Sequence, residues 1–354
     1  MAGFLFLTWN GGGTTVPVRA IAGELRGRGH DVRVLGHAVQ AAQFGDAGIP
    51  FSPYPRAGGF EVGSSPRRLL ALMRDRDAAR DVDDELDARP VNLVVGDALL
   101  VSTLSALRRR GQRYALLEPT VDTLLRVRMR QSGPMLRPVG LDVRSALDGA
   151  DAVVVASVRE LDPRAGADAQ HVGPMVRAVA ARAERPTVLL SLSTFGFPHL
   201  ADTWRRLMGA VSGMPARVIA TTGPALDPAE LDAPPNVETH RWGDHSEIMP
   251  GVSAVVTHGG HGTTIAALAH GVPVLVLPLD ATSDQPGIGR IVERAGVGIR
   301  LPRRAPAATT RAAIERLLHD DDLRRRASEL GARIRAYGGA PAGADALLRA
   351  AHGT

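Results

Sequence analysis

Residues 252–278 read VSAVVTHGGHGTTIAALAHGVPVLVLP, and this stretch decides the fold. It opens with a run of small and β-branched residues, Val252 to Thr257, which predicts a buried strand. Three glycines lie in the turn that follows, and the apolar residues beyond Thr263 recur at helical spacing until a glycine and a proline end the pattern. A second apolar run, PVLVLP, predicts another strand. Strand, helix and strand in this order form a parallel βαβ unit.

The same alternation of short apolar runs and amphipathic stretches continues along the chain. The runs are GFLFLT, DVRVLG, NLVVGD, RYALLE and DAVVVA, then TVLLSLST, ARVIATT, NVETHR, VSAVVTHGG, PVLVLP and VGIRL. This pattern predicts an α/β protein whose parallel sheets are covered by helices on both faces. Residues 157–186 have the proline, glycine and small residues of a linker. We therefore predict a domain over 1–156, a linker over 157–186, a second domain over 187–335, and a helix over 336–354 that packs back on the first domain.

Composition points to a globular protein and excludes several classes. The chain has 354 residues, 44% of them hydrophobic, and no cysteine, so it forms no disulfide. Its formal charge is +5, but its basic residues are all arginine and are scattered along the chain, which argues against nucleic-acid binding. No apolar run reaches the ~20 residues of a membrane helix, and the start of the chain does not resemble a signal peptide. These features predict a cytoplasmic protein without stable membrane insertion.

The glycine-rich turn of the first stretch is suited to an anion. Its glycines let backbone approach a ligand, and the next helix presents unpaired N–H groups with the positive end of its dipole. His258 and Thr263 add side-chain donors. Such turns also close βα units without binding anything, so the surroundings decide. Trp242 offers a ring for a nucleobase, and Asp284 with Gln285 offers groups for sugar hydroxyls.

Within residues 236–301 the motifs NVETHRW, HSEIMP, VTHGGHGT, GVPVLVLPLDATSDQ and GVGIRL resemble the donor site of family 1 glycosyltransferases, in particular the bacterial enzymes of antibiotic and natural-product biosynthesis. The resemblance implies the GT-B fold, in which two Rossmann-like, doubly wound parallel-sheet domains face a cleft. It implies a nucleotide-diphosphate sugar as co-substrate, no other cofactor and no metal. The donor-binding residues that it implies are Ser193, Thr194, Trp242, His258, Gly260, Gly262, Thr263, Asp284 and Gln285.

The N-terminal loop GGGTTVP, residues 11–17, departs from the family pattern. The family carries a histidine, or in some glycopeptide enzymes an aspartate, at the position of Thr14. A threonine hydroxyl has too little proton affinity to act as a general base near neutral pH. Asp97 matches the aspartate that partners the family's histidine, and Asp122 follows the next strand. A carboxylate desolvated at either position would have a raised pKa and become a competent base.

Three explanations of Thr14 stay open. Asp97 or Asp122 is the base, although Asp97 also suits a helix cap. Alternatively the acceptor is a phenol, whose pKa of about 10 makes it easy to ionise, or an activated aromatic carbon. A weak base suffices for either acceptor. In the third explanation the protein is a catalytically silent nucleotide-sugar-binding partner of another transferase. We favour the first two together, since a silent homologue has little reason to keep a full donor site.

The acceptor pocket is expected in residues 52–75 and 118–140, taken as loops after strands of the first domain, and in the N-terminal loop. These segments are rich in aromatic and methionine side chains, which suit a flat hydrophobic aglycone. The acceptor-binding residues expected are Asn10, Gly13, Phe60, Met73 and Met129.

Together these expectations describe an inverting, metal-independent glycosyltransferase that moves a deoxyhexose or related sugar from TDP or UDP to an aromatic or phenolic natural product such as a polyketide. The sugar is linked to oxygen or carbon of the acceptor. The partners are the aglycone and the nucleotide sugar, and these expectations are compatible with a homodimer. The alternatives are the silent binder, a MurG-like transferase and a nucleotide-sugar epimerase. An epimerase needs several carboxylates and no acceptor pocket, so Trp242, Asp284 and Gln285 speak against it.

Overall fold

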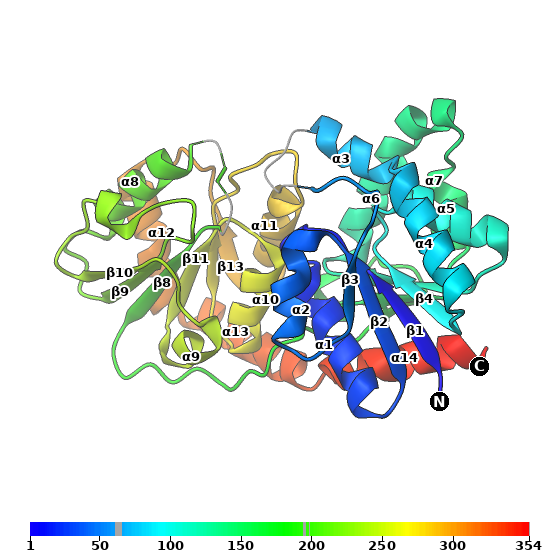
Figure 1. Ribbon diagram of the computed structural model, residues 1–354. Helices are drawn as coiled ribbons and strands as arrows, with labels where there is room; N and C mark the ends of the chain where they lie inside the picture. Colours follow the sequence, from blue (N-terminus) through cyan, green and yellow to red (C-terminus); the bar gives the residue numbers. More distant parts are fainter. Residues whose placement is uncertain (61–65, 194–195, 198, 354) are drawn as a thin grey trace. The chain divides into compact units, whose positions relative to one another are not determined.

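The computed structural model describes residues 1–60, 66–193, 196–197 and 199–353. The chain divides into two compact units (Figure 1). The first consists of Met1–Met175 with Gly338–Thr354, and the second of Val176–Tyr337. Each is built on a parallel sheet, as the sequence predicts. No helix within the described ranges combines the length and the apolar character needed to cross a lipid bilayer.

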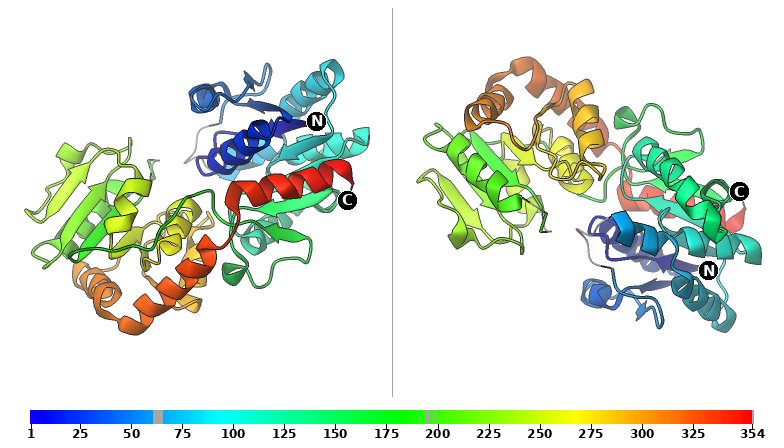
Figure 2. Two further views of the ribbon diagram at one scale, coloured as in Figure 1. Left: turned by 90° about the horizontal axis from the view of Figure 1, so that it is seen from below. Right: turned by 90° about the horizontal axis from the view of Figure 1, so that it is seen from above.

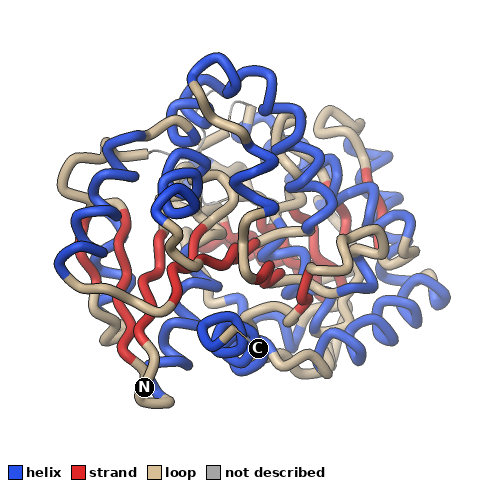
Figure 3. Tube along the Cα trace, turned by 90° about the vertical axis from the view of Figure 1, so that its right-hand side faces the viewer, coloured by secondary structure: helices blue, strands red, loops and turns tan. Residues whose placement is uncertain are grey.

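The sheet of the first unit has the strand order β3-β2-β1-β4-β5-β6-β7. Its strands are β1 (Gly3–Leu7), β2 (Asp31–Gly36), β3 (Phe51–Pro53), β4 (Leu93–Gly96), β5 (Tyr114–Glu118), β6 (Ala152–Val155) and β7 (Ala169–His171). All neighbouring strands described here run parallel, and helices lie on both sides of them (Figure 3). The order changes direction between β1 and β4, which are adjacent although two strands separate them in sequence.

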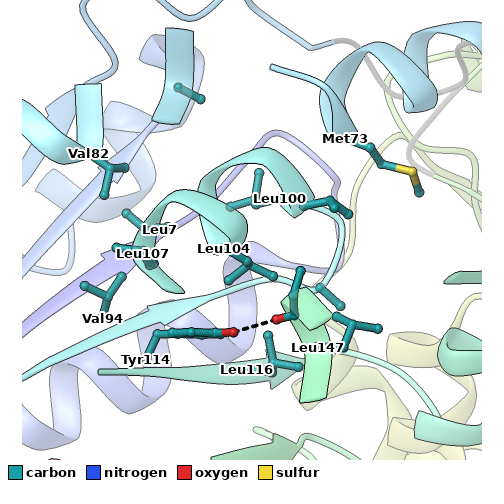
Figure 4. Close-up of a cluster of buried hydrophobic side chains, with 14 of the residues drawn as sticks. Leu7, Met73, Val82, Val94, Leu100, Leu104, Leu107, Tyr114, Leu116 and Leu147 are labelled. Carbon is teal, nitrogen blue, oxygen red and sulfur yellow. Dashed lines mark hydrogen bonds between the residues drawn. The ribbon is translucent and has the colours of Figure 1, made fainter. Parts of the chain in front are cut away.

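The helices of the first unit are α1 (Thr15–Gly27), α2 (Ala41–Gly45), α3 (Pro66–Met73), α4 (Arg76–Ala88), α5 (Val101–Arg110), α6 (Asp122–Leu136), α7 (Val143–Asp148) and α14 (Gly339–His352). Side chains alternate across β1, so Phe4 and Phe6 enter one core while Leu5 and Leu7 enter the other. Figure 4 shows the Leu7 core, where the buried Tyr114 hydroxyl donates to the carbonyl oxygen of Ala146 at 2.7 Å.

The C-terminal helix α14 belongs to the first unit and packs against α1 and β6 (Figure 2). Ala344 and Leu347 join the core on the α1 side of the sheet and are completely buried. Gly343 faces Ile21 of α1, where a Cβ would lie 2.6 Å from Ile21 Cδ1. The last helix therefore completes a core that the N-terminal segment begins.

The sheet of the second unit has the order β10-β9-β8-β11-β12-β13. Its strands are β8 (Thr187–Ser191), β9 (Arg217–Thr221), β10 (Val237–His240), β11 (Ala254–Thr257), β12 (Val274–Val276) and β13 (Gly298–Arg300). Its helices are α8 (Leu200–Val211), α9 (His245–Ile248), α10 (His261–Ala269), α11 (Gln285–Arg294), α12 (Ala307–His319) and α13 (Asp321–Arg335). The fully buried Trp204 of α8 lies in the core that α8 and α12 form with one face of the sheet.

Each apolar run predicted as a strand contains one, but the sequence analysis missed β3 and β7. The segment predicted as a linker differs from the structure, because the first unit extends to Met175 and includes β7. The expectation that 52–75 and 118–140 are loops is wrong in part. Most of the second segment forms α6, which accommodates Gly133 and Pro134 near its end, and α3 occupies part of the first.

One glycine contact in the second unit predicts a stability difference. At Gly331 of α13 a Cβ would lie 2.7 Å from backbone atoms of Gly271 and Leu268, which cannot move aside easily. We expect Gly331→Ala to lower the free energy of unfolding by about 1–3 kcal/mol, as overpacking does. Gly209→Ala in α8 is the matched control, because the added Cβ would lie 3.9 Å from its nearest neighbour, which is an ordinary van der Waals distance. Urea denaturation of both variants tests this, and equal stability would contradict it.

Candidate active site

Three strand ends meet at one edge of the second sheet. The register pairs Thr257 of β11 with Ser191 of β8 and with Val276 of β12. The segments that follow these strands, with Ser193, His258 and Asp284, therefore share the carboxyl edge. The strand order changes direction between β8 and β11, which is where open parallel sheets bind ligands.

The turn between β11 and α10 is shaped by two glycines. Gly259 has φ +90°, and a Cβ there would lie 2.8 Å from Val276 Cγ1 and 3.0 Å from the carbonyl oxygen of Gln285. Gly260 is the N-cap of α10 in an extended conformation. As a glycine, this N-cap residue has no side chain with which to cap the helix. The first turn of α10 thus presents backbone N–H groups and a positive dipole end at the sheet edge.

His258 lies against this turn as a neutral imidazole. The ring is partly exposed, but its Nδ1 is enclosed and has no hydrogen-bond partner within the described part of the chain. Burial lowers the pKa of His258 to about 4, so the ring is uncharged at neutral pH. Phe197 lies beside it, with ring centroids 6.0 Å apart. The neutral ring can donate one hydrogen bond to an anion.

The lowered pKa of His258 also has a consequence for stability. The pKa of an unfolded histidine is about 6.5, so the unfolded chain binds this proton at a higher pH than the folded one. His258 therefore makes the second unit less stable as the pH falls from about 6.5 towards about 4.

The other donor-site residues lie along the same unit. Trp242 follows β10 and is 70% exposed, roughly 14 Å (three strand spacings) across the sheet from β11. A ligand that reaches both must be extended. Ser193 is buried, and Thr194 lies outside the described residues. In the first turn of α10, Thr263 is partly exposed and Gly262 is exposed, with open space where its Cβ would be.

The loop between β12 and α11 is closed by Gln285. This side chain is 3% exposed, and its Oε1 accepts hydrogen bonds from the backbone N–H groups of Leu279 (2.8 Å) and Asp280 (3.0 Å). A sugar would therefore meet Nε2 rather than Oε1. Asp284 occupies the N-cap position of α11 and is partly exposed.

In the first unit the strand order changes direction between β1 and β4, and Asp97 follows β4 there. It is 6% exposed, and its Oδ1 accepts a hydrogen bond from the N–H of Leu99 at 2.8 Å. Burial raises the pKa of Asp97 to about 6, while the N–H groups of Leu99 and Trp9 act in the opposite direction. Asp97 is thus mostly a carboxylate at neutral pH and is basic enough to accept a proton.

Asp122 is placed differently from the expectation that it faces an open site. It is the first residue of α6 and is fully buried, and its Oδ1 accepts from Arg126 Nε at 2.5 Å. The sequence analysis missed Glu118, which ends β5 and is 1% exposed. Burial and the neighbouring Asp122 raise the pKa of Glu118 well above its usual value. Asp122 is a poorer base than Asp97, because it is fully buried and its Oδ1 is engaged by Arg126.

The Thr14 side chain stabilises the N-terminal loop and is not a proton acceptor. Its buried hydroxyl donates to the carbonyl oxygen of Trp9 at 3.0 Å. A buried histidine that the sequence analysis missed, His37, follows β2, and its Nδ1 accepts from the N–H of Asn10 at 3.3 Å. This bond puts the proton of the neutral ring on Nε2, and burial lowers the pKa of His37. His37 therefore does not replace the missing general base.

The expected acceptor residues divide into two groups. Asn10 and Phe60 come together, because Asn10 Nδ2 donates to the carbonyl oxygen of Phe60 at 3.1 Å. Gly13, which is close to Asn10 in sequence, is exposed. Met73 and Met129, by contrast, are 2% and 0% exposed and lie in the hydrophobic core. The expectation that these two methionines line an open pocket is wrong for this conformation, since apolar side chains in α3 and α6 complete the core.

Comparisons with known proteins agree with this arrangement. Residues 205–341 match the family described as erythromycin biosynthesis protein CIII-like, C-terminal domain. Tylactone mycaminosyltransferase of Streptomyces fradiae is 35% identical over 160 residues, which cover 42% of this chain and 34% of that protein. Elloramycin glycosyltransferase of Streptomyces olivaceus is 36% identical over 174 residues, which cover 49% and 43%. Over these segments the chain is similar to glycosyltransferases of the natural-product type.

Solved structures show the fold of this chain. The calicheamicin glycosyltransferase CalG4 has a TM-score of 0.81 and 24% identity, and the comparison covers 100% of this chain and 98% of that one. The glycosyltransferase VinC in complex with DTDP has a TM-score of 0.79 and 19% identity, and the comparison covers 99% of this chain and 100% of that one. The GT-B fold predicted from the sequence is thereby confirmed. The matched segments span less than half the length of the two curated relatives named above.

The turn before α10 generates a prediction about His258. A Cβ at Gly260 would lie 2.7 Å from both Cε1 and Nε2 of the imidazole. We expect Gly260→Ala to displace the ring towards solvent and to raise the pKa of His258 from about 4 by at least one unit. Gly262→Ala is the matched control, because nothing lies within 4 Å of its Cβ. Histidine NMR titration of the ligand-free variants measures this, and an unchanged pKa in Gly260→Ala would refute it.

Proposed function

We propose that this chain is an inverting, metal-independent glycosyltransferase that transfers a deoxyhexose or related sugar from TDP or UDP to a hydrophobic aromatic or phenolic natural product. The observation that carries the proposal is the start of α10, whose N-cap is the glycine Gly260, beside neutral His258 at the strand-order reversal of the second sheet. Similarity to glycosyltransferases named for tylactone and elloramycin supports the substrate class, and the DTDP complex of VinC supports a thymidine nucleotide. No cofactor besides the nucleotide sugar enters the proposal, and we place the reaction in the cytoplasm.

The second unit supplies the leaving-group side of the reaction. Negative charge develops on the diphosphate as the bond to the anomeric carbon breaks. Backbone N–H groups of α10 and a neutral donor at His258 oppose this charge without reorganising, which is how oxyanion sites lower a barrier. Trp242 is exposed enough to stack on the base, while Asp284 and Gln285 Nε2 are assigned to the sugar.

The first unit supplies the base. The acceptor oxygen attacks the anomeric carbon, its proton passes to the Asp97 carboxylate, and the nucleotide diphosphate leaves from the opposite face, so the configuration inverts. Asp97 has a pKa of about 6, and a phenol has a pKa of about 10. Complete proton transfer before attack would cost about 5 kcal/mol, and general-base catalysis avoids part of it. An alcohol would cost more, which favours phenols or activated aromatic carbons.

A silent nucleotide-sugar binder is the second candidate, because Thr14 provides no base and its hydroxyl is engaged with Trp9. Calorimetric titration with TDP and UDP, beside product analysis with TDP- and UDP-sugars and aromatic polyketide acceptors, separates the two. A glycosylated product of inverted anomeric configuration supports the transferase. Nucleotide binding without transfer supports the silent binder, and failure to bind either nucleotide removes both.

Asp97→Asn removes the proposed base and keeps the shape of the side chain. We expect turnover to fall at least about 100-fold, with little change in the Kd for the donor. In the unmodified protein kcat/KM should rise with pH through a midpoint near 6, because protonated Asp97 cannot accept a proton. Asp87→Asn, which changes a carboxylate on α4 that pairs with Arg110, is the control and should leave turnover unchanged. Wild-type turnover in Asp97→Asn would exclude Asp97 as the base.

Metal independence has its own test. Because helix N–H groups and His258 are assigned to the diphosphate, turnover should be the same in EDTA as in buffer with Mg²⁺ or Mn²⁺. Product formation is measured after the protein has been dialysed against EDTA. Loss of turnover that Mg²⁺ or Mn²⁺ restores would show that a metal holds the diphosphate.

A further inference from the structure

We propose that Asp81 is a positioning residue for acceptor binding: it fixes residues 54–60, here called the Phe60 segment, whose last side chain packs on Trp9. The inference rests on the proposed function and deepens it, because it names a residue that sets the affinity for an aromatic acceptor. Asp81 belongs to α4 and acts through Phe60, not on the reacting atoms.

The Asp81 carboxylate binds the middle of the Phe60 segment. Its side chain is 0% exposed. Oδ2 accepts hydrogen bonds from the backbone N–H groups of Arg56 at 2.9 Å and Ala57 at 3.1 Å, and Oδ1 accepts from Arg56 Nη1 at 2.9 Å. A buried carboxylate is costly unless it is paired and hydrogen-bonded, and these three bonds offset that cost. Residues 56 and 57 are therefore fixed relative to α4.

Both ends of the Phe60 segment meet Asn10. At one end the Tyr54 ring packs on the His37 ring, with centroids 5.6 Å apart, and His37 Nδ1 accepts from the N–H of Asn10 at 3.3 Å. At the other end Asn10 Nδ2 donates to the carbonyl oxygen of Phe60 at 3.1 Å. The Phe60 ring meets the Trp9 indole edge to face, with centroids 4.9 Å apart. The segment is thus held in its middle by α4 and at its ends by the N-terminal loop.

The sheet places the Phe60 ring on the side of the proposed base. β1 and β4 are neighbours, and Trp9 and Asp97 follow the carboxyl ends of these two strands. Trp9 is 7% exposed, whereas the Phe60 ring that packs on it is partly exposed. Aromatic rings pair with one another beyond the simple burial of their area. The exposed part of Phe60 therefore offers an aromatic acceptor a surface at the sheet edge that holds Asp97.

Asp81 affects this surface because it shortens the unanchored part of the chain. With Ala57 bound, only Gly58 and Gly59 separate this anchor from Phe60. A shorter free stretch loses less entropy when its end is held in place. A surface that is ordered before the ligand arrives also binds more tightly than one that must be ordered on binding. Loss of the Asp81 anchor should therefore weaken acceptor binding.

Asp81→Asn tests the inference, because it keeps the shape of the side chain but replaces one acceptor oxygen by a donor. We expect the KM for an aromatic polyketide acceptor to rise about 3- to 10-fold, with kcat and the donor Kd unchanged. A loss of folded protein would instead lower kcat and leave KM as it is, so the two parameters separate positioning from stability.

Asp84→Asn is the matched control. The Asp84 side chain is 61% exposed, and its Oδ2 accepts from Nη2 of the same Arg56 at 2.6 Å. This variant removes a carboxylate from the same arginine and leaves both backbone bonds to Asp81 in place. The acceptor KM should therefore stay at the wild-type value.

Hydrogen–deuterium exchange provides a measurement without turnover. The amide N–H groups of residues 56 and 57 should exchange faster in Asp81→Asn than in the wild-type protein or in Asp84→Asn. If Asp81→Asn does not fold, Asn10→Ser releases the other anchor of Phe60 and should raise the acceptor KM in the same way.

The outcomes separate this inference from the proposed function. If the wild-type protein glycosylates the acceptor but KM and amide exchange do not change in Asp81→Asn, the inference alone is overturned. An unchanged KM in Asn10→Ser has the same meaning where that variant is the one tested. If the wild-type protein gives no glycosylated product, the proposed function is overturned, and the role of Asp81 in acceptor binding with it.

Discussion

Burial of both sheet faces is the constraint on which the rest of this structure depends. The strands of each unit are covered on two sides, so their central residues must be apolar, and polar chemistry is confined to the strand ends. A change of strand order leaves such an end accessible to a ligand. The residues assigned to the base and to the diphosphate follow β4 and β11, beside such a change in their own sheets.

Desolvation then sets the protonation states at these strand ends, with opposite effects on acids and imidazoles. It raises the pKa of Asp97 to about 6 and lowers that of His258 to about 4. At neutral pH the first group is mostly charged and the second is neutral. The same burial, together with the neighbouring Asp122, raises the pKa of Glu118 well above its usual value. Desolvation thus yields a base at Asp97 and a neutral donor at His258.

The sequence was sufficient for the strands and the donor motif, since parallel strands read as continuous apolar runs and glycine turns are local. It was insufficient where tertiary contacts decide. β3 and β7 are short edge strands without a fully buried residue, so neither forms an apolar run that the sequence would show. Apolar side chains such as Met73 and Met129 suit a ligand pocket as well as a hydrophobic core. Only the packing of the folded chain shows which of the two they line. Glu118 was missed because its burial, which raises its pKa, is decided by tertiary packing and leaves no local pattern.

The departure at Thr14 has a physical explanation in these contacts. A histidine there would bring a second base, whereas threonine ties the loop to the Trp9 carbonyl and leaves proton removal to one carboxylate. The pKa of this single carboxylate, about 6, lies about four units below the pKa of a phenol, and the difference from an alcohol is larger. Lowering that barrier through a stronger base would need a higher pKa, which would leave less carboxylate at neutral pH. The N–H groups around Asp97 therefore fix a compromise that suits an acidic acceptor.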